Sequence, residues 1–159
     1  MKNLLGLSFV LFLACLIISC SESTSSNDDV SFSNEAANGY FEYYNWYRAV
    51  RSMSDVEMNS DIVSQSKYHC SSLSLSNLDN HDDYDKRVEA IKKVFPNAKN
   101  ITEITGTIVI SADNYILSNP DFYPNTNYNE SLYDYIGIAA KKSGEKDTWI
   151  ATVIVIDSD

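Results

Sequence analysis

The pattern of hydrophobic and polar positions divides the chain into three parts. Residues 4–18 are apolar apart from a glycine and a serine. Residues 21–33, with the sequence SESTSSNDDVSFS, are mostly polar and offer little to bury in a core. From residue 35 onward, apolar residues recur at spacings typical first of helices and then of strands. The pattern therefore predicts one folded domain over residues 35–159, preceded by two segments that do not contribute to its core.

Three helices are predicted in the first half of this domain. The aromatic-rich stretch 35–51 favours the first. The second begins near Asn59, a residue type that caps helix N-termini well, and runs to Leu73. The third spans residues 83–95 and ends before Pro96, which cannot continue a helix.

The second half of the domain has the composition of β-strands. Residues 101–110, 135–142 and 148–157 are rich in β-branched and apolar side chains. In the last stretch both alternating sets of positions are apolar or small, which is typical of a strand covered on both faces. The Asn- and Tyr-rich residues 119–134 are predicted to form a loop. Together these elements predict an α+β fold, a three-layer α-β-α sandwich with a central antiparallel sheet.

The apolar start of the chain is typical of an export signal. Lys2 supplies a positive charge, and the apolar run is too short to favour a membrane span. It ends in the sequence IISC at residues 17–20, which resembles a bacterial lipobox, where the cysteine, here Cys20, is lipidated. We therefore expect a lipoprotein signal peptide over residues 1–19 and a flexible polar tether over residues 20–34. An ordinary cleaved signal with an incidental cysteine is the alternative.

Composition and charge narrow the classes of partner. The 159 residues include 12 Lys and Arg against 22 Asp and Glu, giving a formal net charge of −10. With no basic stripe for phosphates, a nucleic-acid partner is not expected. The lipid anchor makes the membrane an expected partner and places the protein in the bacterial cell envelope. The acidic pair Asp28 and Asp29 resembles a surface-export signal, which favours the outer membrane or the cell surface.

A series of short motifs follows along the domain in a fixed order. They are Asn45-Trp46-Tyr47-Arg48, Met58 to Ile62 with Ser66 and His69, then His81, Arg87 and Glu103, then Tyr115-x-x-Ser118-x-x-Asp121, and Ile136-Gly137-Ile138. In this order they resemble the CAP superfamily, the SCP-like domain of cysteine-rich secretory proteins, antigen 5 and pathogenesis-related proteins, in a divergent bacterial lipoprotein form. The resemblance covers roughly residues 35–156 and implies that family's α-β-α sandwich.

The resemblance also implies a ligand-binding cleft. In the family, one histidine after the second helix, a glutamate and a second histidine face a shared cleft, and the histidines can hold a divalent metal. His81 and Glu103 match two of these positions, whereas Asp121 replaces the second histidine. The expected cleft therefore contains His81, Glu103 and Asp121, with Tyr123 and Tyr128 from the loop as further lining.

A metal ion such as zinc at His81, Glu103 and Asp121 stays open as an alternative, although no cofactor is required. Zinc sites take three or four protein ligands, and imidazole suits zinc better than a lone carboxylate. A site with two histidines would need His69 together with His81. His69, however, lies on the expected core side of its helix and is predicted to be a hydrogen-bonded structural residue. Its neighbour Cys70 is predicted to be a buried thiol rather than a nucleophile.

The acidic run at residues 79–85 resembles a calcium-binding loop only superficially. Tyr84 stands where such a loop needs glycine, and Ala90 stands where it needs a bidentate glutamate. We expect a solvated loop whose last acidic residues cap the third helix.

Two function classes fit these observations. The first is a non-catalytic binding module for a lipid, glycan or protein ligand, because tyrosines among asparagines offer a large contact area. The second is a metal-assisted or acid/base hydrolase, with His81 and Glu103 as the catalytic candidates. A third alternative is a structural surface protein whose site has decayed.

Overall fold

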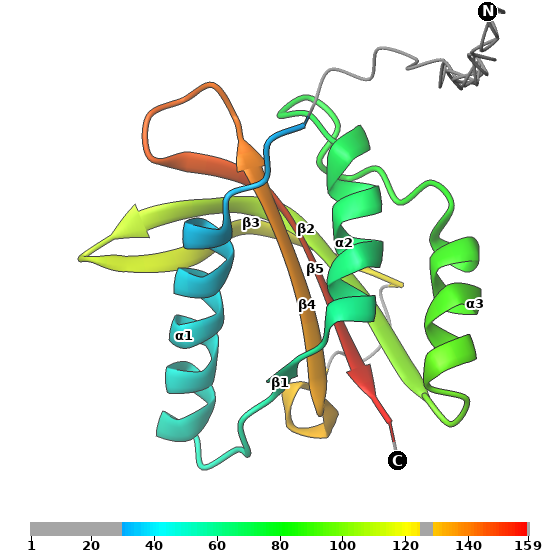
Figure 1. Ribbon diagram of the computed structural model, residues 1–159. Helices are drawn as coiled ribbons and strands as arrows, with labels where there is room; N and C mark the ends of the chain where they lie inside the picture. Colours follow the sequence, from blue (N-terminus) through cyan, green and yellow to red (C-terminus); the bar gives the residue numbers. More distant parts are fainter. Residues whose placement is uncertain (1–29, 125–128, 159) are drawn as a thin grey trace, which may run out of the picture.

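The computed structural model describes residues 30–124 and 129–158 (Figure 1). The three helices are α1 (Asn34–Val50), α2 (Ser60–Ser72) and α3 (Tyr84–Val94). The strands are β1 (Glu57–Met58), β2 (Asn100–Ser111), β3 (Asn114–Tyr123), β4 (Tyr135–Lys142) and β5 (Thr148–Asp157), and a short 3-10 helix, η1 (Glu130–Leu132), precedes β4. The predicted signal peptide and its Cys20 lie outside the described residues. None of the described helices combines the length and apolar character that crossing a bilayer requires.

Side-chain caps fix where the first two helices begin. The Ser33 hydroxyl and the Asn59 side-chain oxygen accept hydrogen bonds from backbone amides in the first turns of α1 and α2, respectively. Helix α3 begins differently. Asp83 occupies its N-cap position with a left-handed φ of 59° and makes no side-chain cap, whereas Asp85, the last acidic residue of the loop, lies in the first turn as predicted. The Asp83 carboxylate instead lies 2.6 Å from the Lys86 ammonium group.

The five strands form one sheet in the order β1-β4-β5-β2-β3. The three predicted strands, β4, β5 and β2, pair antiparallel as expected; β3, which was not predicted, pairs antiparallel with β2, and β1 extends the other edge by pairing parallel with β4. Because β1 has only two residues, its sequence carries no strand pattern. Strand β5 lies between two long antiparallel partners, so both of its hydrogen-bonding edges are paired.

Helices cover both faces of this sheet (Figure 1). The odd-numbered residues of β5 from Trp149 to Val155 pack in one cluster with tyrosines and alanines of α1. The even-numbered residues Ile154 and Ile156 pack in a second cluster with Ile62 of α2 and Ile91 of α3. The chain therefore has mixed α and β structure around a sheet buried on both sides, and the predicted α+β class is confirmed.

The prediction of a loop over residues 119–134 is wrong at its start, because residues 119–123 complete β3. This strand lies at the sheet edge and is mostly half-buried or exposed, so it lacks the apolar alternation of a strand with one buried face. Strand β2 pairs with β5 along one edge and with β3 along the other. The register between β2 and β3 shifts near Asn119, whose φ is 51°. This β-bulge bends β3 and so sets the direction of its last residues.

Candidate functional site

Three segments that are far apart in the sequence bring His81, Glu103 and Asp121 together. His81 comes from the connection between α2 and α3, Glu103 from β2 and Asp121 from β3. The Nδ1 atom of His81 lies 2.8 Å from Glu103 Oε1, and its Nε2 atom lies 3.3 Å from Asp121 Oδ2. The His81 ring thus lies between two carboxylates, one buried and one partly exposed. The three residues expected in one cleft are thus in direct contact.

Arg87 of α3 fixes the position of the Glu103 carboxylate. Arg87 Nε donates to Glu103 Oε2 at 2.6 Å, and Nη2 donates to Oε1 at 2.7 Å. Both side chains are almost completely buried, with exposed fractions of 2% for Arg87 and 0% for Glu103. The remaining nitrogen, Nη1, donates to the backbone carbonyl of Asp82 at 2.6 Å. One guanidinium group therefore fastens both the glutamate and the loop that carries His81.

Helix and strand periodicity explain why Arg87 meets Glu103. Arg87 is four residues before Ile91, so both lie on the face of α3 that packs toward the sheet. Glu103 lies two residues after Ile101 in β2, on the sheet face that α2 and α3 cover. The pair therefore occupies the layer between α3 and the sheet, among apolar side chains.

His69 of α2 lies beside this pair as a neutral, hydrogen-bonded residue. Its Nε2–H donates to the Asn80 carbonyl at 2.8 Å. The other ring nitrogen, Nδ1, then accepts from the Thr152 hydroxyl, which lies 3.2 Å from it. The His69 and His81 rings stack with centroids 5.8 Å apart. Burial lowers the pKa of His69 below its ordinary value and outweighs the attraction of the Glu103 charge. These contacts agree with the structural role expected for His69.

The Glu103 carboxyl group is ionised. Burial alone would raise the pKa of Glu103. Hydrogen bonds from His81 and Arg87, together with the positive charge of Arg87, instead lower this pKa below its ordinary value. Both carboxylate oxygens are engaged, and neither reaches solvent. Glu103 is therefore a charged structural anchor of the site.

An open cleft lies outside this buried network. Its lining consists of Asp79, Asn80, His81, Asp82, Asp121, Phe122 and Tyr123. The Tyr123 ring stacks on the His81 ring with centroids 4.7 Å apart, and 42% of Tyr123 stays exposed. The Tyr84 and Tyr123 rings meet edge to face, with their centroids 5.0 Å apart. Asp121 and Tyr123 therefore line the cleft beside His81, whereas Tyr128 lies outside the described residues.

The donor atoms of His69, His81 and Glu103 lie within 4.8 Å of one another, which is the two-histidine combination that a metal site would need. The hydrogen bonds oppose this use. His81 Nδ1 already donates to Glu103, and His69 Nδ1 already accepts from Thr152. The Arg87 guanidinium, bonded to the same carboxylate, would repel a second cation. The residues therefore form a closed hydrogen-bond network that does not fit a resident metal ion.

The sequence interpretation missed Arg87 as a member of the site. The available signal was its position, since a charged residue four positions before Ile91 falls on the apolar face of α3. A charge on such a face needs a buried partner, because an unpaired buried charge is strongly unfavourable. Glu103, 16 residues away, is that partner.

No protein-family model matches this chain, and comparisons with curated proteins and with solved structures also give no match. The resemblance to the CAP superfamily therefore stays a prediction from its sequence motifs.

We expect Glu103→Gln to lower the free energy of unfolding by about 3–5 kcal/mol, because it leaves the Arg87 charge buried without a counter-ion. Chemical denaturation of the purified protein measures this loss. Asp83→Asn, which breaks the exposed contact with Lys86, is the matched control and should change stability little. Equal effects of the two substitutions would contradict the account.

We also expect stability to fall as the pH drops below 6.5. The pKa of His69 is lower in the folded chain than its ordinary value of 6.5, so the unfolded chain binds more protons between the two values. Stability from this group is complete above pH 6.5 and is lost as the pH falls through the lowered pKa. Because the pKa of Glu103 is also lowered in the folded chain, a second loss of stability begins as the pH falls below about 4.5.

The variant His69→Gln isolates the first of these losses. Its unfolding free energy should change less than that of the wild-type chain between about pH 7 and pH 5, because glutamine does not titrate. Denaturation curves at a series of pH values measure the difference. Identical pH dependence of the two proteins over this interval would show that His69 does not titrate as described.

Proposed function

We propose that this chain is a lipid-anchored protein of the bacterial cell envelope whose CAP-like α-β-α domain is a non-catalytic binding module. Its ligand site is the open cleft beside His81, Asp121 and Tyr123. The observation that carries this proposal is the complete engagement of Glu103 by Arg87 and His81. The network supplies a rigid support for the cleft and leaves the glutamate with no free oxygen for a substrate.

The hydrogen bonds that hold Glu103 also argue against acid/base hydrolysis. A general base must come within hydrogen-bond reach of the proton that it removes, and its pKa must suit that transfer. Glu103 is completely buried, and its pKa is lowered, so it is both inaccessible and a weak base. The exposed partner of His81 is Asp121, whose Oδ2 atom lies 3.3 Å from His81 Nε2.

The lining of the cleft favours a glycan or a basic protein segment over a lipid chain. Asp79, Asp82 and Asp121 offer carboxylates, and Asn80 offers an amide. Such groups bind hydroxyls or cations, whereas an acyl chain needs a mainly apolar lining. The exposed ring of Tyr123 adds a flat surface for stacking.

Removal of this ring tests the proposed binding role. Tyr123→Ala should weaken retention on envelope glycans or on whole bacterial cells by about tenfold, because a stacked aromatic contact is lost. Trp46→Ala is the matched control, since Trp46 is also an exposed aromatic residue but lies on α1, outside the cleft lining. Pull-down with bacterial cell-wall fractions measures retention, and equal retention of both variants would contradict the proposed site.

A metal-assisted hydrolase is the second candidate function, and the closeness of the three donor atoms of His69, His81 and Glu103 favours it. Our account predicts that zinc added to the full chain produces no saturable binding heat and no rise in melting temperature. Calorimetry and thermal unfolding provide the test. Saturable binding that disappears in His81→Ala would favour the hydrolase instead.

The lipid anchor is tested separately. Cys20→Ser should move the protein from the membrane fraction to the soluble fraction and abolish incorporation of labelled fatty acid, because the acylated thiol is absent. Cys70→Ser is the matched control and should keep the label. A Cys20→Ser protein that stays acylated and membrane-bound would show that the lipobox assignment is wrong.

A further inference from the structure

The two carboxylates beside the His81 ring differ sharply in their access to solvent. Nδ1 of the ring is 2.8 Å from Glu103 Oε1, and Nε2 is 3.3 Å from Asp121 Oδ2. The exposed fraction of the side chain is 0% for Glu103, 7% for His81 and 51% for Asp121. One ring therefore connects the buried ion pair to a carboxylate that lines the open cleft.

A neutral imidazole has a single N–H group, so it can donate a hydrogen bond to only one of these carboxylates. Glu103 needs that bond more, because it is ionised and completely buried, and a buried charge without hydrogen bonds is strongly unfavourable. The exposed Asp121 carboxylate can be hydrated instead. In the neutral ring, the Nε2 lone pair then faces an Asp121 oxygen, and two acceptors do not bond. Only a ring that is protonated on both nitrogens bonds to both carboxylates.

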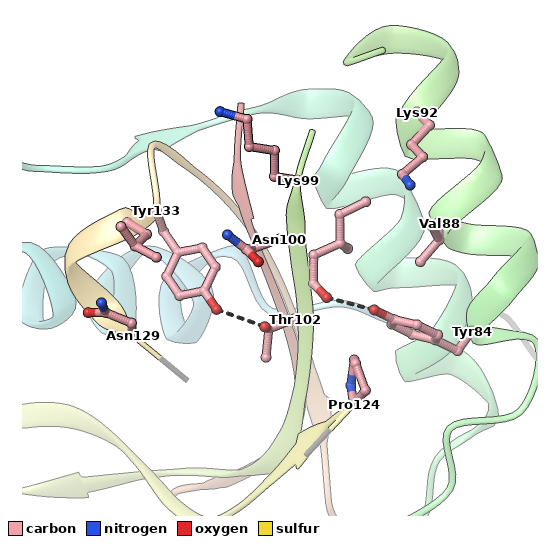
Figure 2. A pocket seen from close by; sticks show the side chains of 11 residues that line it. Tyr84, Val88, Lys92, Lys99, Asn100, Thr102, Pro124, Asn129 and Tyr133 are labelled. Carbon is pink, nitrogen blue, oxygen red and sulfur yellow. Dashed lines mark hydrogen bonds between the residues drawn. The ribbon is translucent and has the colours of Figure 1, made fainter. Parts of the chain in front are cut away.

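Neighbouring side chains restrict the movement of the His81 ring. The Tyr123 ring stacks on it with centroids 4.7 Å apart, and the His69 ring stacks with centroids 5.8 Å apart. Tyr84, which meets the Tyr123 ring edge to face, donates its hydroxyl to the Ile101 carbonyl at 2.6 Å (Figure 2). The group that is free to move when Nε2 loses its proton is therefore the exposed carboxylate.

Charged groups from several elements act on the proton at Nε2. Carboxylates from three segments face the ring or line the cleft beside it, namely Glu103 of β2, Asp121 of β3, and Asp79 and Asp82 of the connection that carries His81. These carboxylates favour the charged ring, whereas burial and the Arg87 guanidinium of α3 oppose it. The other titratable neighbours are the His69 imidazole and the phenol groups of Tyr84 and Tyr123.

We infer that the contact between His81 and Asp121 depends on the second proton of the ring and thereby makes ligand binding in the cleft sensitive to pH. The doubly protonated ring holds the Asp121 carboxylate and places a positive charge beside the cleft. After Nε2 loses its proton, this carboxylate is free to accept hydrogen bonds from a hydroxyl or ammonium group of a ligand. The cleft therefore binds such a ligand more weakly as the pH falls. The effect on the ligand rests on the proposed function, whereas the contact itself does not.

Nitrogen-15 NMR of the imidazole rings in the full chain tests the contact without a ligand. The chain has two histidines, so His69→Gln leaves only the signals of His81. Between pH 5 and pH 8, where imidazole groups titrate, Nε2 of His81 should lose its proton as the pH rises, and Nδ1 should keep its proton. Loss of the proton from Nδ1 instead, or a ring that does not titrate in this interval, would overturn the inference.

Two aspartate variants show whether Asp121 acts through direct contact. Asp121→Asn should move the midpoint of the His81 titration to lower pH by at least about half a pH unit, because the charged ring loses a carboxylate partner. Asp79→Asn is the matched control, since it removes an exposed carboxylate of the same cleft that forms no ion pair with any described residue. Its effect on the midpoint should be smaller. Equal changes in the two variants would overturn the inference.

Retention on bacterial cell-wall fractions at pH 5 and pH 8 tests the effect on the ligand. The wild-type chain should be retained at least about threefold more weakly at pH 5, because protonation and ligand binding compete for Asp121. Asp79→Asn should keep this difference. Asp121→Asn should be retained at pH 8 about as weakly as the wild-type chain at pH 5. Equal wild-type retention at the two pH values, or full retention of Asp121→Asn at pH 8, would overturn the regulatory role. Failure of the Tyr123→Ala test alone would count against the proposed site and leave the NMR result standing.

Discussion

Arg87 and Glu103 bring opposite charges together in the layer between α3 and the sheet, where neither side chain is exposed to solvent. Two charges in such a place are stable only when paired and fully hydrogen-bonded, and here the guanidinium binds both carboxylate oxygens. The same guanidinium also binds the backbone carbonyl of Asp82. Arg87 therefore fixes α3, β2 and the loop before α3 relative to one another. The position of His81, which lies in that loop, depends on this contact.

This pairing also determines what the site can do. A glutamate that is held on both oxygens contributes order and charge, but it does not exchange protons with a substrate. The chemistry that remains accessible belongs to His81, Asp121 and Tyr123, where the imidazole ring lies beside one outer carboxylate and is covered by an aromatic ring. Such a surface can recognise a ligand by hydrogen bonding and stacking, which is why we propose binding rather than catalysis.

The helices and central strands could be predicted because their sequences show clear periodicity and capping signals. Strand β3 was missed because an edge strand buries little, and β1 was missed because two residues carry no pattern. His81 and Glu103 are separated by the whole of α3, so their contact depends on how α3 packs and could be expected only from the family resemblance. Arg87 could have been recognised as a buried charge, but its partner could not be named without the register of β2 against α3.

Titration of the Glu103 carboxyl group itself tests the central claim most directly. Carbon-13 NMR of the glutamate side chains, assigned by comparison with Glu103→Gln, follows the ionisation of this group as the pH is lowered. Our account predicts that Glu103 stays ionised down to a pH below its ordinary pKa of 4.5, because Arg87 and His81 stabilise the charged form. A Glu103 carboxyl group that takes up its proton between about pH 6 and pH 7, as a general base tuned for catalysis does, would contradict the account.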